Sequence, residues 1–235
     1  MPERRFTILS TTTLPTEQLD YPSKEMDVRI IPFIDILPIS SDKIKTQIEK
    51  YAAGKKTVVF TSAHAVNSVT RFLQQIPAWD IYCVGKATRS AIEKWFGENC
   101  IIASAKNAQV LSEIIIADGI PQAVFFCGDQ RMDILPENLK NHHILLDELV
   151  VYETRLTPVQ VEEPLDAILF FSPTAVKSFF SMNTLSAETK IFAMGSTTAA
   201  VLKENTTNPV IISPEPEKAF VFNMALEYAG AHPIQ

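Results

Sequence analysis

Short apolar runs alternate with longer amphipathic stretches along most of this chain. The runs Val58-Val-Phe60 and Ile168-Leu-Phe-Phe171 are apolar on both faces, which is typical of strands in a parallel sheet that helices cover on two sides. Each run ends in a small polar residue or a glycine, and a stretch with apolar residues at helical spacing follows it. The alternation predicts an α/β fold built of doubly wound parallel sheets.

The pattern places the expected elements as follows. The first half of the chain is predicted to contain strands near 57–61, 80–84, 100–103 and 123–127, with helices near 42–53, 63–75, 86–96, 107–117 and 134–141. The second half is predicted to contain strands near 166–171, 190–194 and 209–213, with helices near 173–182, 196–205 and 216–229. Gly54 and Gly97 stand where helices should end in left-handed caps, and Pro173 stands just inside a helix start.

The chain contains an internal repeat. Residues 58–68 align with 168–178, residues 81–88 with 191–198, and residues 101–102 with 211–212, so the three blocks share one displacement of 110 positions. In the first block Phe, Ser, Ala, Val and the final Ser coincide. Any α/β protein repeats a strand followed by a helix, but this alternation does not explain why three blocks share one displacement without a gap. We therefore predict two doubly wound α/β units related by duplication.

Two segments match neither a full repeat strand nor a loop. They are Val28–Leu37, which Pro32 and Pro38 punctuate, and Ile144–Thr154. We predict that both segments are crossovers between the units. We also predict that Met1–Ser10 supplies a strand to the C-terminal unit.

Composition limits the classes of function. The 235 residues are 46% hydrophobic and 20% charged, as in an ordinary globular protein, and 21 Lys and Arg against 27 Asp and Glu give a net charge of −6. Without clustered basic residues a nucleic-acid surface is not expected, so local groups must hold any anionic ligand. No apolar stretch approaches the roughly 20 residues of a membrane span, and no signal peptide is recognisable. We expect no nucleic-acid partner and no membrane.

The cysteines point to a reducing compartment. Cys83, Cys100 and Cys127 are odd in number, widely spaced and without a C-x-x-C pair. We interpret them as small buried hydrophobic residues, since a disulfide framework would need paired cysteines. The cytoplasm is therefore the expected location.

Candidate binding groups gather where predicted strands end. In open α/β sheets, ligands bind at the carboxyl ends of the strands, which here are Thr61-Ser62, Gly85, Cys127-Gly128, Phe171-Ser172 and Gly195. A glycine lets the backbone approach a ligand, and the helix start that follows presents N–H groups to anions. The segments 86–88 and 196–198 add hydroxyl groups that we expect to cap these helices. Ser and Thr cap helices everywhere, but the paired set favours a site for a ligand with several carboxylates.

Other chemistry lacks its motifs. The chain contains no G-x-G-x-x-G after a strand, no G-x-x-x-x-G-K-[ST] and no G-x-S-x-G, and its four histidines lack metal-ligand spacing. We therefore expect neither a metal nor an organic cofactor. Arg131 lies near Asp129, Asp133 and Glu137, which favours a solvated helix face, although Arg131 is also a candidate partner for a substrate carboxylate.

Six short motifs in order resemble the uroporphyrinogen-III synthase family. They are Phe60-Thr-Ser-Ala-His-Ala-Val66, Val84-Gly-Lys-Ala-Thr88, Cys127-Gly128 with Ile134-Leu-Pro-Glu-Asn-Leu139, Val151-Tyr-Glu-Thr154, Phe171-Ser-Pro173 and Gly195-Ser-Thr-Thr198. Ala63 and Ser196 depart from the pattern, because proline is usual at both positions. The resemblance covers essentially the whole chain.

The resemblance implies two α/β domains joined by a two-stranded linker. One domain is discontinuous and consists of residues 1–30 plus 155–235, and the other is an inserted domain of residues 36–149. The linker strands fall at 31–35 and 150–154.

The resemblance also implies a reaction. The substrate is a linear tetrapyrrole, hydroxymethylbilane, which loses its terminal hydroxyl and closes with the last pyrrole ring inverted. Tyr152 is the expected catalytic residue, as donor to the departing hydroxyl, and the alternative is a tyrosine packed in the ladder of linker strands. A monomer is expected. The predicted substrate-binding residues are Thr61, Ser62, His64, Gly85, Lys86, Thr88, Gly128, Arg131, Thr154, Ser172, Thr174, Gly195, Ser196, Thr197 and Thr198.

Two alternatives stay open at this point. One is a two-domain binding protein that grips an anionic ligand without chemistry, since a fold alone does not decide function. The other is an inactive member of the family that binds a tetrapyrrole.

Overall fold

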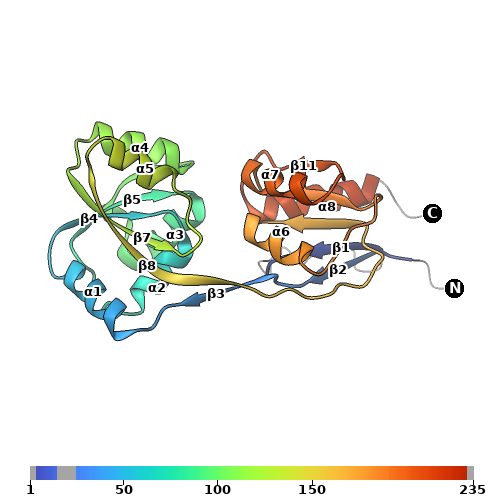
Figure 1. Cartoon of the computed structure of the whole chain (residues 1–235), viewed down its shortest axis with the longest axis horizontal. Coiled ribbons are helices and arrows are strands. Elements are labelled where there is room, and N and C mark those ends of the chain that lie inside the picture. Colours follow the sequence, from blue (N-terminus) through green and yellow to red (C-terminus); the bar gives the residue numbers. More distant parts are fainter. Residues whose placement is uncertain (1–3, 15–24, 232–235) are drawn as a thin grey trace. The chain divides into compact units, whose positions relative to one another are not determined.

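The structure, a computed structural model, describes residues 4–14 and 25–231. The chain divides into two compact units, one formed within Met1–Asp35 and Arg155–Gln235 and the other by Ile36–Thr154, which we call unit 1 and unit 2. Figure 1 shows that each is a sheet flanked by helices. Residues 1–3, 15–24 and 232–235 of the predicted discontinuous domain lie outside the described residues.

Unit 2 is built on a six-stranded sheet. Its order is β3-β8-β7-β4-β5-β6, and the strands from β8 to β6 pair in parallel. The strands are β3 (Ile34–Pro38), β4 (Lys56–Phe60), β5 (Trp79–Val84), β6 (Ile101–Ala105), β7 (Gln122–Gly128) and β8 (Leu145–Leu156). The helices are α1 (Asp42–Ala52), α2 (Ala63–Thr70), α3 (Lys86–Phe96), α4 (Ala108–Ala117) and α5 (Ile134–Asn141), with a short 3-10 turn at Glu98–Cys100.

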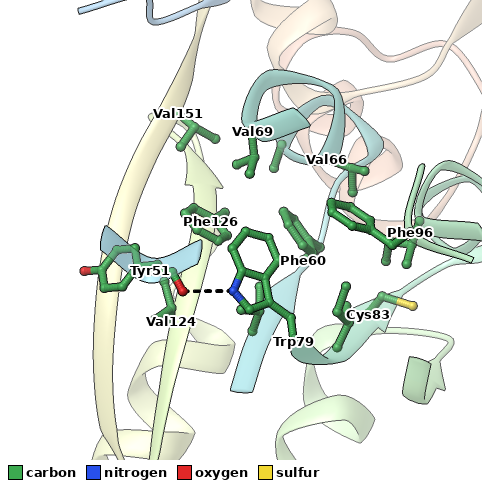
Figure 2. Packing of buried hydrophobic residues seen from close by; sticks show 14 of the residues in the cluster. Tyr51, Phe60, Val66, Val69, Trp79, Cys83, Phe96, Val124, Phe126 and Val151 are labelled. Atoms are coloured by element: carbon green, nitrogen blue, oxygen red, sulfur yellow. Dashed lines mark hydrogen bonds between the residues drawn. The ribbon is translucent and has the colours of Figure 1, made fainter. Parts of the chain in front are cut away.

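Both faces of this sheet are buried because alternate strand residues point to opposite sides. Val58 and Phe60 of β4 pack with residues of α1, α2 and α3, whereas Val59 packs with residues of α4 and α5. Figure 2 shows the first of these layers, in which the indole Nε1 of Trp79 donates to the carbonyl oxygen of Tyr51 at 3.0 Å. Each fully buried aromatic side chain of this kind contributes about 1.5–3 kcal/mol through burial.

Unit 1 repeats the plan with five strands in the order β11-β10-β9-β1-β2, all paired in parallel. One face of the sheet packs against α6 and α7 and the other against α8. The strands are β1 (Phe6–Ser10), β2 (Met26–Ile30), β9 (Ala167–Phe170), β10 (Lys190–Ala193) and β11 (Val210–Ile212), and the helices are α6 (Pro173–Phe180), α7 (Ser196–Asn205) and α8 (Lys218–Ala231).

The predicted repeat is confirmed. Helices α2 and α6 begin at residues 63 and 173, α3 and α7 at 86 and 196, and α4 and α8 at 108 and 218, so the register of 110 positions continues beyond the blocks seen in the sequence. Strands β4, β5 and β6 take the same places in their sheet as β9, β10 and β11 in theirs. The places of β7 and β8, however, are taken in unit 1 by β1 and β2 from the start of the chain. The prediction that the N-terminal segment supplies a strand is thereby confirmed for its described residues.

The interpretation of the two irregular segments as crossovers was only partly right. Val28 belongs to β2 and pairs with Ile8 of β1, so the first segment begins inside the sheet of unit 1. The second segment forms most of β8, which pairs with β7 from Leu145 to Tyr152. The apolar pattern did not predict this strand, because polar Asp147 and Glu148 interrupt its apolar residues.

Two local predictions also need correction. Gly54 does not adopt a positive φ, since α1 ends at Ala52 and its C-cap is Ala53, which has a φ of −70° and donates its N–H to the carbonyl of Glu49. Helix α2 ends at Thr70, short of the predicted 75. Gly97, with a φ of 82°, and Pro173, at the first turn of α6, behave as predicted.

Candidate active site

The predicted site residues of unit 2 follow the carboxyl ends of adjacent parallel strands. Thr61 and Ser62 come directly after β4, Gly85 after β5, and Gly128 ends β7. Ser62 is the N-cap of α2, where its hydroxyl accepts from the backbone N–H of His64 at 3.1 Å. The parallel pairing of these strands brings their ends to one edge of the sheet, as the sequence predicted.

Tyr152 lies directly over Gly128. A Cβ atom added to Gly128 would lie 2.4 Å from Cζ of Tyr152 and 2.7 Å from its hydroxyl oxygen. No side chain fits in that space, so Gly128 must be glycine for the phenol to occupy this position. We predicted that Gly128 would admit a ligand; the structure shows instead that the tyrosine ring fills the room beside it.

The phenol of Tyr152 is partly buried and has neighbours that fix its orientation. Burial raises its pKa above the usual 10.0, while a hydrogen bond with the Ser62 side chain lowers the pKa and the nearby Cys127 and Asp129 raise it. The ring of exposed His64 meets the tyrosine edge-on, with centroids 5.8 Å apart. The raised pKa keeps Tyr152 protonated at neutral pH, which is the form that donates a proton.

Two hydrogen bonds hold the part of β8 around Tyr152 against the end of β7. The N–H of Asp129 donates to the carbonyl of Tyr152 at 3.2 Å, and the carboxylate of Asp129 accepts from the N–H of Thr154 at 2.8 Å. Thr154 thus contributes to the site through its backbone, by fixing the strand that carries Tyr152. The register of β7 and β8 shifts between Cys127 and Gly128, next to the position of the ring.

Gly85 begins α3 with a φ of 84° and a ψ of 154°, a conformation that favours glycine. An added Cβ would meet nothing within 4 Å, so the space beside this helix start is open. No side chain caps the helix, which leaves backbone N–H groups of its first turn to other acceptors. Backbone N–H groups at a helix start favour anions, so anion binding after Gly85 stays a prediction.

The threonines predicted as helix caps do not have that role. The N-cap residues of α3 and α7 are Gly85 and Gly195, and neither helix has a side-chain cap. Thr88 and Thr198 are the third residues of their helices and are 4% and 2% exposed. Helical geometry turns this position toward the sheet, so the exposed Lys86, Ser196 and Thr197 are the residues that face outward.

Arg131 is engaged by carboxylates of its own chain. Its guanidinium forms ion pairs with Asp133 and Glu148, and these carboxylates raise the pKa of Arg131 against the opposing effect of burial. A substrate carboxylate at Arg131 would have to compete with both. The pairing favours a structural role for Arg131 in joining the start of α5 to β8.

Unit 1 offers a similar set of strand-end groups. Ser172 caps α6 by accepting from the N–H of Ala175 at 3.2 Å, and half-buried Thr174 lies in the first turn. Gly195 precedes α7 and also borders open space. Its φ is −170°, an extended conformation open to any residue, so it differs from Gly85 in needing no glycine for its backbone.

Sequence reasoning missed one group at this edge of unit 1. The hydroxyl-rich segment Ser10–Thr13 begins at the last residue of β1, and the ammonium of Lys218 donates to Thr12 and Thr13. The run of hydroxyl residues after an apolar strand was a visible signal, since it matches the other strand ends. Nothing in the sequence around Lys218 indicates that it would meet them.

Other features of the described residues lie elsewhere. A cavity of about 570 Å³ in unit 1 is lined by residues that precede β9 and β10, including Asp166 and Glu188, at the opposite edge of the sheet. In the part of the chain that the structure describes, no group of three His, Cys, Asp or Glu side chains could hold a metal ion, and no helix is both long and apolar enough to cross a bilayer.

The structure defines a two-unit α/β protein with parallel sheets. Each unit has hydroxyl groups and an uncapped helix start at its strand ends. The family model described as "Uroporphyrinogen-III synthase HemD" matches residues 23–221. This chain therefore belongs to the uroporphyrinogen-III synthase family, which confirms the resemblance seen in its motifs.

Individual relatives agree with this assignment. The chain is 24% identical over 213 residues to the uroporphyrinogen-III synthase of Schizosaccharomyces pombe, with 81% of this chain and 82% of that protein covered. It is 26% identical over 196 residues to the enzyme of Chlorobaculum parvum, with 74% and 78% covered.

Solved structures support the fold. The uroporphyrinogen-III synthetase of Helicobacter pylori matches with a TM-score of 0.68 at 17% identity, covering 96% of this chain and 100% of that one. A mutant uroporphyrinogen III synthase of Thermus thermophilus matches with a TM-score of 0.66 at 14% identity, covering 96% and 99%.

Proposed function

We propose that this protein closes the linear tetrapyrrole hydroxymethylbilane to uroporphyrinogen III, with inversion of the last pyrrole ring and loss of water. Family membership supports the reaction. The structural observation that supports it best is the Tyr152 phenol, which Gly128 admits to the edge of the sheet where parallel strands end. A protonated phenol at such an edge is suited to assist the loss of a hydroxyl group.

The chemistry asks little of an acid. The pyrrole nitrogen donates electrons toward the terminal hydroxymethyl group, so its C–O bond breaks readily and the oxygen leaves as water with a proton from Tyr152. The substituted carbon of the last ring attacks the resulting electrophile and forms a spiro intermediate. That intermediate fragments and recloses with the ring inverted, and the proton released on final closure restores the phenol.

Controlling the conformation of the linear tetrapyrrole is harder than assisting the loss of its hydroxyl group. The same electrophile closes spontaneously without inversion, so the enzyme must hold the chain in the geometry that favours the spiro route. The carboxylate arms of the substrate are the groups by which the protein can hold it in that geometry. We infer that they bind at the helix starts after Gly85 and Gly195, and at the caps Ser62 and Ser172, where N–H groups and the positive end of the helix dipole favour anions.

The test is the identity of the product. The protein is incubated with freshly prepared hydroxymethylbilane, the products are oxidised, and the uroporphyrin isomers are separated. We expect mainly isomer III, against mainly isomer I in a control without protein. If isomer I still dominates while the protein binds uroporphyrin, the chain is a tetrapyrrole-binding protein without this activity.

We also infer that the protein works as a monomer in the cytoplasm. Its three cysteines are free, which fits a reducing compartment. Sedimentation in the presence and absence of uroporphyrin, and cell fractionation, would test the two statements separately.

A further inference from the structure

Lys218 begins α8 and reaches the carboxyl end of β1. Its Nζ atom donates to the hydroxyl oxygen of Thr12 at 3.3 Å and to the carbonyl oxygen of Thr13 at 3.1 Å. Strand β1 lies beside β9 in the parallel sheet of unit 1. Lys218 therefore lies at the same sheet edge as Ser172 and Gly195.

Among the described residues, the ammonium of Lys218 has neutral partners only. None of the ion pairs between described residues includes it, whereas Arg4, at the opposite edge of the sheet, pairs with Asp166 at 2.6 Å. A lysine has three N–H donors, and the two contacts with Thr12 and Thr13 leave one for another acceptor. Burial lowers the pKa of Lys218 below 10.5, because the charged ammonium loses solvation.

This arrangement costs stability unless something compensates it. A half-buried charge without a counter-ion is unfavourable in a folded protein, and an isosteric apolar side chain would avoid the cost. Unit 2 carries no such charge, since α4 begins with Ala108 at the position that corresponds to Lys218. A positive charge kept at a strand-end edge, with a donor to spare, fits a ligand that brings its own negative charge.

We propose that Lys218, oriented by Thr12 and Thr13, binds one carboxylate of the tetrapyrrole substrate. The proposal rests on the proposed function, which supplies a ligand with carboxylate arms. The ammonium and the carboxylate form a charge-assisted hydrogen bond in a partly desolvated site. The ligand thereby provides a counter-ion, which the described residues do not supply.

Binding of uroporphyrin III, measured by its fluorescence, tests the site without catalysis. We expect Lys218→Met to weaken binding about ten-fold, in line with the loss of one hydrogen bond to a charged group. Lys218→Arg keeps the charge and should stay within about three-fold of wild type. The matched control is Lys203→Met, which removes an exposed lysine near the end of α7, at the other edge of the sheet, and should change binding less than about two-fold.

Stability separates a ligand-binding lysine from a structural one. Because Lys218→Met removes a charge that forms no ion pair with the described residues, its unfolding midpoint in urea should equal or exceed that of wild type. Unchanged affinity in Lys218→Met would overturn the proposal, and so would a Lys218→Met protein that is less stable or does not fold. If wild type forms no isomer III but Lys218→Met still weakens uroporphyrin binding, the proposed reaction fails and the carboxylate site stands.

Discussion

The ring of Tyr152 occupies the space in which a side chain at residue 128 would lie. Because an added Cβ would lie 2.4–2.7 Å from three atoms of the tyrosine side chain, Gly128→Ala must displace the ring. We expect a loss of about 1–3 kcal/mol in unfolding free energy, as is usual for overpacking, together with release of isomer I. Urea unfolding and isomer analysis measure the two effects.

The control for this substitution is Gly54→Ala. An alanine Cβ there meets nothing within 4 Å and needs no positive φ, so stability should change by less than about 0.5 kcal/mol. In a Tyr152→Ala background the stability cost of Gly128→Ala should disappear, because the ring that the Cβ meets is gone. A full cost in that background would show that Gly128 does not act through Tyr152.

Tyr152→Phe tests acid assistance directly. The change removes one donor but keeps the ring, and general acid catalysis is typically worth about 10²–10⁴ in rate. Since this leaving group departs easily, we expect a fall at or below the lower end of that range, with more isomer I. Because the pKa of Tyr152 lies above the usual 10.0, its phenol stays protonated through the neutral range. Ionisation of Tyr152 should therefore cause no decline of the wild-type rate at neutral pH.

Tyr82→Phe is the matched control for the loss of a hydroxyl. The Tyr82 hydroxyl donates to Asp118 at 2.8 Å on the other face of the same sheet. Its removal should lower stability and leave isomer purity unchanged. Equal leakage of isomer I from both variants would mean that the Tyr152 hydroxyl has no specific role.

The buried thiol of Cys127 should make the free energy of unfolding depend on pH in the alkaline range. Burial, with a smaller contribution from Glu148, raises the pKa of its thiol from 9.0 to about 11. The folded state therefore holds this proton more tightly than the unfolded state, and the resulting stability is complete below pH 9 and is lost as the pH rises toward 11. Urea midpoints between these pH values should fall more steeply for wild type than for Cys127→Ala. Parallel slopes would contradict the assignment.

At the scale of elements, the starts of α3 and α7 form a natural pair for comparison. Gly85→Ala should cost about 1–3 kcal/mol, because a φ of 84° with a ψ of 154° is strained for any other residue. Gly195→Ala should be neutral or stabilising by up to about 1 kcal/mol, since its extended backbone accepts a Cβ and the unfolded chain loses entropy. The denaturant midpoints of the two variants measure the difference.

The two variants should agree in their effect on function. Both place a methyl group in open space beside a helix start that we propose binds carboxylates. We expect weaker uroporphyrin binding in each, so that Gly195→Ala gives a stable protein with reduced affinity. Unchanged affinity in Gly195→Ala would remove that helix start from the site.

At the scale of the whole molecule, the proposed reaction needs no added group. The pyrrole nitrogen drives departure of the hydroxyl, and substrate binding controls which carbon attacks. Exhaustive chelation followed by gel filtration should therefore leave the rate and the isomer ratio unchanged. Activity that disappears on this treatment and returns with a metal ion would contradict the mechanism.

The sequence by itself determined the architecture and the family. Short apolar runs, helical spacing and the constant register are local patterns, and burial of a sheet between helices imposes them on nearby residues. The same logic located Ser62, Gly85, Ser172 and Gly195 at strand ends, because the turn from a strand into a helix demands particular residues there. Strands β2 and β8 were not recognised, because their segments were interpreted as crossovers and charged residues interrupt the apolar pattern of both.

The tertiary structure alone decided which distant residues meet. Tyr152 over Gly128, Arg131 beside Glu148, and Lys218 against Thr12 each join separate elements, the last pair across 206 positions. No local pattern encodes such contacts, because they depend on strand order and on the register between strands. For the same reason the sequence assigned Gly128 to the ligand and Thr88 to a helix cap, whereas packing placed a tyrosine ring beside the first and buried the second.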